Sequence, residues 1–215
     1  FKNIRQYFNL KIINFSKCGP LKDNNYQNLN LKKYDNFQLY LYLENSKEEI
    51  KKNLRKSYLS ILKKKTINEI FTFNYETDDK KIWLDFKKLH FSESKKKTRS
   101  DKSWEKQFEN LQKGKAIFLY SLEKNKLIAG SFFDLTSDES LYSVGVYNEN
   151  ARKKFISHYI QEKAIEEFKI RKIKWYFLGK YHPNIKDNVS KKEYNISFFK
   201  KGFSSKIINN FIVQI

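Results

Sequence analysis

Residues 115–147, KAIFLYSLEKNKLIAGSFFDLTSDESLYSVGVY, decide the fold class of this 215-residue chain. They contain three apolar runs, each about the length of one strand, separated by two short polar segments. The predicted strands are 115–122, 127–135 and 141–147. The segment 123–126 is short enough for a hairpin turn, and 137–140 is a second polar turn. Consecutive strands should therefore pair as a three-stranded antiparallel meander.

Outward from this meander the pattern alternates between helices and single strands. The elements expected before it are a strand at 37–43, a helix at 46–65 with a Ser46–Glu49 capping box, a strand at 67–75, and helices on either side of a polar loop at 92–101. Those expected after it are a helix at 155–171, a strand at 173–178, a short helix at 196–201 and a strand at 207–215. This order predicts a mixed α/β (α+β) fold, with a mostly antiparallel central sheet and helices on both faces.

The predicted domain organisation is an irregular N-terminal segment, 1–36, followed by a single domain at 37–215. Because the sequence begins at Phe1 and contains no Met, we expect the N-terminal segment to be truncated. The single cysteine, Cys18, excludes an intramolecular disulfide and a cysteine-based zinc site. No apolar run reaches about 18 residues, so no membrane span is expected. The expected location is the cytoplasm, with peripheral contact at the cytoplasmic membrane as an addition.

The formal net charge is +20 and the pI is about 9.7. Such a charge attracts polyanions, among them tRNA, nucleotide-linked substrates and anionic membrane surfaces. The lysines are scattered along the chain, and the joint abundance of Lys, Asn and Ile is typical of an AT-rich genome. The sequence leaves both explanations of the charge open.

Short motifs occur in a fixed order over residues 50–205. They are 53–58 (NLRKSY), 83–90 (WLDFKKLH), 97–100 (KTRS), 104–107 (WEKQ), 114–116 (GKA), 127–130 (LIAG), 142–145 (YSVG), 157–158 (SH) and 200–203 (KKGF). Together they resemble the FemAB-related, or Fem-type, branch of the GNAT acyltransferase superfamily. The resemblance implies a GNAT-like domain that transfers an acyl or aminoacyl group to an amine. Fem-type enzymes take amino acids from aminoacyl-tRNA and attach them to peptidoglycan precursors, and relatives acylate other envelope substrates.

One segment departs from the GNAT pattern. GNAT enzymes carry a glycine-rich loop whose backbone N–H groups hold the coenzyme A pyrophosphate. The corresponding segment here, 147–154 (YNENARKK), has no glycine, although Arg152, Lys153 and Lys154 offer phosphate-binding side chains. The departure favours an aminoacyl-tRNA donor over acyl-CoA, or else marks an inactive relative. No tightly bound cofactor and no metal are expected, and the donor stays open between the two.

The expected catalytic residues are His90, Tyr142, Tyr147 and His158. His90 follows an apolar helix face and has the usual pKa of a general base, although a structural cap is an equal alternative. His158 opens a helix, where the dipole does not favour a histidine for structural reasons. Tyr142 and Tyr147 are proton carriers or packing residues.

The expected substrate-binding residues come from several parts of the chain. They are Arg55, Lys56 and Tyr58 on the first helix, Thr98 and Arg99 in the polar loop, Trp104 and Gln107 on the helix after it, Gly145 near the predicted splay of strands 141–147 and 173–179, and Ser157 at the start of the helix that follows segment 147–154. Arg99 offers a planar fork for a phosphate or carboxylate. Gly145 lies inside a strand, which suggests a bulge or the close approach of a ligand.

The sequence thus predicts a transferase that moves an acyl or aminoacyl group to an amine of a cell-envelope or glycan precursor, by direct attack without a metal or a covalent intermediate. One alternative is an acyl-CoA-dependent N-acyltransferase acting on an amino sugar. Another is a basic binding module, for RNA or an anionic membrane surface, on a degenerate transferase fold. The expected partners are the donor, the amine-bearing precursor, tRNA and the inner membrane face.

Overall fold

The computed structural model describes residues 12–15, 32–64, 68–185 and 189–214 of the chain. The chain divides into two compact units. One unit is formed by residues 41–177, and the other joins residues 1–40 with residues 178–215. The prediction that 37–215 form a single domain stays a prediction.

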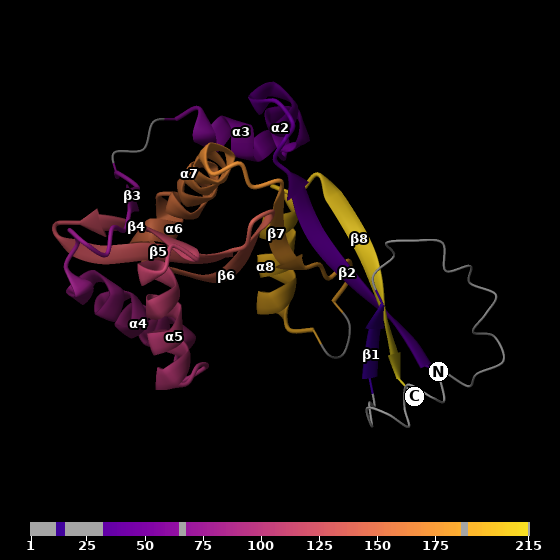
Figure 1. The fold of residues 1–215 in the computed structure, drawn as a ribbon. Coiled ribbons are helices and arrows are strands. Elements are labelled where there is room, and N and C mark those ends of the chain that lie inside the picture. Colours follow the sequence, from indigo (N-terminus) through magenta and orange to yellow (C-terminus); the bar gives the residue numbers. More distant parts are fainter. Residues whose placement is uncertain (1–11, 16–31, 65–67, 186–188, 215) are drawn as a thin grey trace. The chain divides into compact units, whose positions relative to one another are not determined.

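The larger unit is built on the predicted meander, which is confirmed (Figure 1). Strands β4 (Ala116–Glu123), β5 (Lys126–Leu135) and β6 (Glu139–Tyr147) pair antiparallel in sequence order. The two-residue strand β3 (Phe71–Thr72) pairs with β4 at one edge. On the other side, β7 (Trp175–Lys180) pairs parallel with β6, from Glu139↔Trp175 to Leu141↔Phe177. The sheet is therefore mixed and mostly antiparallel, as predicted.

Helices cover both faces of this sheet, as predicted (Figure 1). On one face, α4 (Lys80–Ser94) lies against β5 and β6, and α5 (Asp101–Gln112) lies against β4. On the other face, α7 (Ile156–Ile170) packs on β4, β5 and β6, and α3 (Lys56–Leu62) packs on α7. Two shorter helices, α2 (Lys47–Asn53) and α6 (Glu149–Lys153), precede α3 and α7 respectively.

The core between α4, α5 and the sheet consists mainly of aromatic rings. The ring of Trp83 lies 5.5 Å from those of Phe86 and Phe118, and Trp104 lies 5.6 Å from both Trp83 and Phe86. Each of these side chains is at most 5% exposed. Burial of this much aromatic surface holds α4 and α5 on the sheet.

Gly130 in β5 allows α4 to approach the sheet closely. A Cβ atom at this position would lie 2.7 Å from atoms of both the Phe86 and the Phe118 rings. The absent side chain thus makes room for two of the largest core residues.

Among the residues that the structure describes, the smaller unit holds strands β1, β8 and most of β2, together with helix α8. Strand β8 (Lys206–Gln214) pairs antiparallel with both β1 (Ile12–Phe15) and β2 (Lys32–Tyr42). Helix α8 (Lys191–Lys201) begins at a capping box of Ser190 and Glu193.

Several predicted boundaries are wrong for identifiable reasons. The helix predicted at 46–65 is two helices, because Leu54 and Arg55 have extended backbone. The break was hidden because Ile50, Leu54 and Tyr58 are buried on both sides of it. The Ser46–Glu49 capping box itself is confirmed.

Other differences come from polar residues that the periodicity did not assign. The segment predicted as irregular, 1–36, contains β1 and the start of β2, whose hydrogen-bond partners lie far away on β8. The strand predicted at 67–75 is confined to β3, because Asn74 and Asp78 form a turn, with the Asn74 N–H donating to the Asp78 carboxylate at 3.0 Å. Helix α4 continues to Ser94, and α8 begins five residues before the predicted start.

We expect Gly130→Ala to lower the free energy of unfolding by about 1–3 kcal/mol, because the new methyl group overlaps Phe86 and Phe118. Urea denaturation measures the change. Adding Phe86→Leu should relieve part of the overlap, so that the double variant loses less stability than the sum of the two single variants. Strictly additive losses would contradict this account.

Candidate functional site

A pocket of about 480 Å³ lies at the C-terminal half of α4 and the loop that leads to α5. Four residues predicted for the site line it together: His90, Thr98, Arg99 and Trp104. The rest of its lining is Leu84, Lys87, Lys88, Phe91, Lys96, Lys97 and Asp101. The wall thus combines apolar and aromatic side chains with a basic rim, which suits an anionic ligand with an apolar or planar part.

Ser100 and Asp101 fix the loop on the α5 side of the pocket. The Ser100 hydroxyl accepts a hydrogen bond from the Ser103 N–H at 3.2 Å and so caps α5. The Asp101 carboxylate binds Lys87 at 2.7 Å and Lys97 at 2.8 Å, and these two ammonium groups lower its pKa to about 2. One carboxylate therefore ties α4 to the loop across the pocket rim.

Arg99 is positioned by a bulge in β6. Strand β6 has one more residue than β5 at this point, because Phe132 pairs with Val144 and Phe133 pairs with Tyr142. The guanidinium of Arg99 donates to the carbonyl of the extra residue, Ser143, at 3.0 Å. Burial lowers the pKa of Arg99 and the nearby Asp134 carboxylate opposes this shift.

His90 lies one turn before the end of α4 rather than at its end, because the helix continues to Ser94. Its ring meets that of Trp104 edge to face, with centroids 5.3 Å apart. Trp104 is 5% exposed and belongs mainly to the core. Gln107, one turn further along α5, is also buried, and its side-chain oxygen has no hydrogen-bond partner among the described residues.

Tyr142 and Tyr147 form a row of hydroxyl groups with Ser131 on the opposite side of the sheet. The Tyr147 hydroxyl lies 2.6 Å from the Ser131 hydroxyl and 3.0 Å from that of Tyr142. Burial raises the pKa of both tyrosines, so that both keep their protons at neutral pH. They suit hydrogen-bond donation better than proton abstraction.

This row lies where β6 extends past its last registered pair with β7, Leu141↔Phe177. The predicted parting of these two strands stays a prediction. Gly145 is needed there, since a Cβ atom would overlap the hydroxyl of Tyr142. The glycine makes room for a side chain of its own strand.

A second group of predicted residues meets between α3 and α7. Arg55 donates to the Tyr58 hydroxyl at 3.0 Å, and the Tyr58 ring meets the His158 ring edge to face at 4.5 Å. His158 is 8% exposed and also contacts Phe155. Burial lowers its pKa to about 4, so it is neutral at pH 7. Ser157 lies beside it, with its hydroxyl 3.4 Å from Nδ1, whereas Lys56 is exposed.

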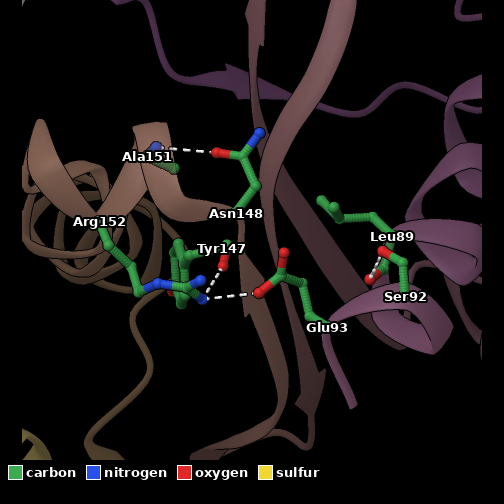
Figure 2. A network of polar contacts seen from close by, with 7 residues as sticks. All are labelled: Leu89, Ser92, Glu93, Tyr147, Asn148, Ala151 and Arg152. Carbon is green, nitrogen blue, oxygen red and sulfur yellow. Dashed lines mark hydrogen bonds and ion pairs between the residues drawn. The ribbon is translucent and has the colours of Figure 1, made fainter. Parts of the chain in front are cut away.

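Arg152, Lys153 and Lys154, which were predicted to bind phosphate, lie on α6 and directly after it. This helix falls within the segment that was predicted as a loop. Asn148 caps this helix at the Ala151 N–H, and Arg152 binds Glu93 of α4 at 2.8 Å and the Tyr147 carbonyl (Figure 2). Lys153 binds Glu149 at 2.7 Å, and Lys154 pairs with Glu123. Each basic group thus faces a different carboxylate.

Sequence reasoning missed several buried polar residues. Gln161 of α7 accepts a hydrogen bond from the Tyr176 hydroxyl, and its amide nitrogen has no partner among the described residues. Ser131 and Gln161 are both fully buried, and their only sequence signal is a polar residue within an apolar run.

Lys200 of α8 was missed as well. A Cβ atom added to Gly179 would lie 2.9 Å from the Nζ of Lys200, and the φ angle of Gly179 is +111°. Burial lowers the pKa of Lys200 to about 8. The signal that could have found it is the KKGF motif, in which it is the first lysine.

Across the described parts of the chain, no group of three His, Cys, Asp or Glu side chains is placed to hold a metal ion. None of the helices described is both long and apolar enough to cross a membrane.

No protein-family model and no curated protein matches this sequence. Among solved structures, the chain is similar to FemX, with 13% identity and a TM-score of 0.65 over all of this chain and 74% of FemX. It is also similar to the C-terminal domain of a putative lysylphosphatidylglycerol synthetase from Agrobacterium fabrum, with 11% identity and a TM-score of 0.61. That match covers 86% of this chain and 61% of the other.

A tandem GNAT protein from the clavulanic acid biosynthesis pathway is a third neighbour, with 12% identity and a TM-score of 0.52. The match covers 94% of this chain and 62% of that protein, so the chain spans less than two thirds of this protein and of the Agrobacterium domain. These likenesses show that the fold is GNAT-like and that FemX shares it. The resemblance that the short motifs indicated is therefore confirmed at the level of the fold.

The low pKa of His158 predicts an acid-sensitive fold. The unfolded chain binds a proton at this histidine near pH 6.5, whereas the folded chain does so near pH 4. The stabilisation is therefore complete above pH 6.5 and is lost as the pH falls to 4, by about 3 kcal/mol. Urea unfolding at pH 7 and pH 4 measures this loss.

His158→Phe keeps a ring between Tyr58 and Phe155 but cannot titrate, so it should lose less stability over the same pH range. His182→Asn serves as the matched control and should keep the full dependence. If the two variants lose stability equally, His158 is not the titrating group.

Proposed function

We propose that this chain is a transferase that moves an acyl or aminoacyl group to the amine of a cell-envelope or glycan precursor. The observation that carries the proposal is the pocket lined by His90, Thr98, Arg99 and Trp104 on a GNAT-like sheet. The likeness to FemX and to the synthetase domain from Agrobacterium fabrum supports the same class. The proposed catalytic domain is 37–215.

The pocket is proposed to bind the phosphate-bearing end of a substrate. Lys87, Lys96 and Lys97 supply positive charge around its rim, and Arg99 adds a planar fork. The part of Trp104 that lines the pocket offers apolar surface to a sugar or base. A ligand with both parts would gain from both surfaces.

The reaction needs one proton removed from the amine and one given to the leaving group. The amine nitrogen attacks the carbonyl carbon, a C–N bond forms, and the bond from that carbon to the oxygen or sulfur of the donor breaks. We assign the proton acceptor to His90, whose imidazole lines the pocket wall. Tyr142 and Tyr147 lie on the other side of the sheet from this pocket, and their hydroxyls are proposed to hold β6 in place rather than to contact the reacting atoms.

His158 and its neighbours receive a supporting role in this proposal. The aromatic enclosure of His158 suits packing of α3 on α7 better than proton transfer. Arg55, Tyr58 and Ser157 then hold this contact, and Lys56 adds exposed charge beside it.

The donor is proposed to be aminoacyl-tRNA, with acyl-CoA as the alternative. Helix α6 stands in the segment where GNAT enzymes have their glycine-rich loop, and its basic residues already face carboxylates. A coenzyme A pyrophosphate would have to compete with these carboxylates. An acyl-CoA-dependent enzyme acting on an amino sugar is therefore the second candidate.

A thermal-shift panel at fixed salt tests the proposal, with acyl-CoAs, charged and uncharged tRNA, and nucleotide-linked amino sugars. A ligand at a hundredfold excess over its Kd stabilises the folded chain by about 2.7 kcal/mol. A selective shift with one donor or acceptor, followed by mass spectrometry of the acylated product, would support a transferase. Shifts with polyanions alone, vanishing as salt rises, would instead indicate a basic binding module.

The variant Arg99→Lys tests whether the selected ligand binds in the pocket. It keeps the positive charge of this side chain and removes the planar guanidinium group. We expect it to weaken the binding of the selected ligand about tenfold. Arg152→Lys makes the same exchange on α6 and should leave binding unchanged. If both variants bind as the unaltered chain does, the ligand does not occupy this pocket.

A further inference from the structure

Two large apolar side chains are exposed on the outer side of α4. Leu84 is 45% exposed and Phe91 is 57% exposed. They are seven residues apart, which places them two turns apart on one side of the helix, with Lys88 between them. The opposite side of α4 is buried through Trp83 and Phe86. The outward face is therefore apolar without contributing to the core.

Positive charge is concentrated around these two side chains. Residues 80–102 contain nine Lys and Arg against three Asp and Glu. Lys88 has a side chain that is 76% exposed, and it contacts Asp85 at 3.3 Å. Lys95 and Lys96 are exposed beyond the end of the helix. We call Leu84, Lys88, Phe91, Lys95 and Lys96 the α4 patch.

The α4 patch is continuous with the pocket. Leu84, Lys88, Phe91 and Lys96 all line the pocket wall as well as the exposed surface. Whatever the patch contacts would lie directly at the mouth of the pocket.

We propose that the α4 patch docks this protein on an anionic lipid membrane. Leu84 and Phe91 enter the boundary between headgroups and acyl chains, and the lysines contact the lipid phosphates. Apolar side chains on one helix face, flanked by lysines, are the composition of helices that lie in this interface. RNA fits less well, because aromatic rings stack on bases whereas an exposed leucine does not. The inference does not depend on catalysis.

Co-sedimentation of the full chain with vesicles tests the proposal. The vesicles contain phosphatidylcholine alone or with about 30 mol% phosphatidylglycerol. We expect binding to the anionic vesicles, falling as salt rises from about 0.1 M to 0.5 M. Leu84→Ser with Phe91→Ser, and separately Lys88→Gln with Lys96→Gln, should each lower the partition coefficient about tenfold or more.

The matched controls lie on other helices. Ile170→Ser removes a side chain that is 74% exposed on α7, and Lys113→Gln with Lys153→Gln removes two exposed charges. Control variants that bind like the unaltered chain, with all melting temperatures retained, support the α4 patch. Equal binding to neutral vesicles, or patch variants that bind as the controls do, would overturn it. So would patch variants that lose binding to tRNA while vesicle binding is unchanged.

Discussion

The packing of Phe86 on the backbone of Gly130 is the contact on which the larger unit depends. It sets how closely α4 approaches the sheet, because no side chain separates the ring from β5. Trp104 of α5 packs on Phe86 in turn, so the second helix is positioned by the first. The pocket lies between these two helices, and the rings of His90 and Trp104 meet in its wall. A core contact thus determines the shape of a surface site.

The parts of the fold that the sequence predicted are those with local signals. The meander follows from three apolar runs and two polar turns, and the four predicted pocket residues are close in sequence, between 90 and 104. Ser131, Gln161 and Tyr176 could not be grouped in advance, because they come from β5, α7 and β7 and meet only after folding. Strand β1 was missed for the same reason, since its partner β8 lies at the other end of the chain.

Net charge alone did not locate a binding surface. The basic residues of 147–154 were the obvious phosphate candidates, yet Arg152, Lys153 and Lys154 each face a carboxylate. Around Phe91, by contrast, Lys87 and Lys97 share the single carboxylate of Asp101, and Lys88 contacts Asp85, so three lysines face two carboxylates. The distribution of acidic partners, which depends on three-dimensional neighbours, separates the two segments.

The bulge at Ser143 bears on how this chain is compared with other proteins of its fold. One residue of β6, Ser143, has no counterpart on β5. The residues after it therefore point to the opposite face from the one that they would take in a strand without a bulge. An alignment with such a strand needs a one-residue gap at Ser143. Without that gap, every residue from 144 to 147 would be assigned to the opposite face of the sheet, and Tyr147 would be matched to a position that points away from α7.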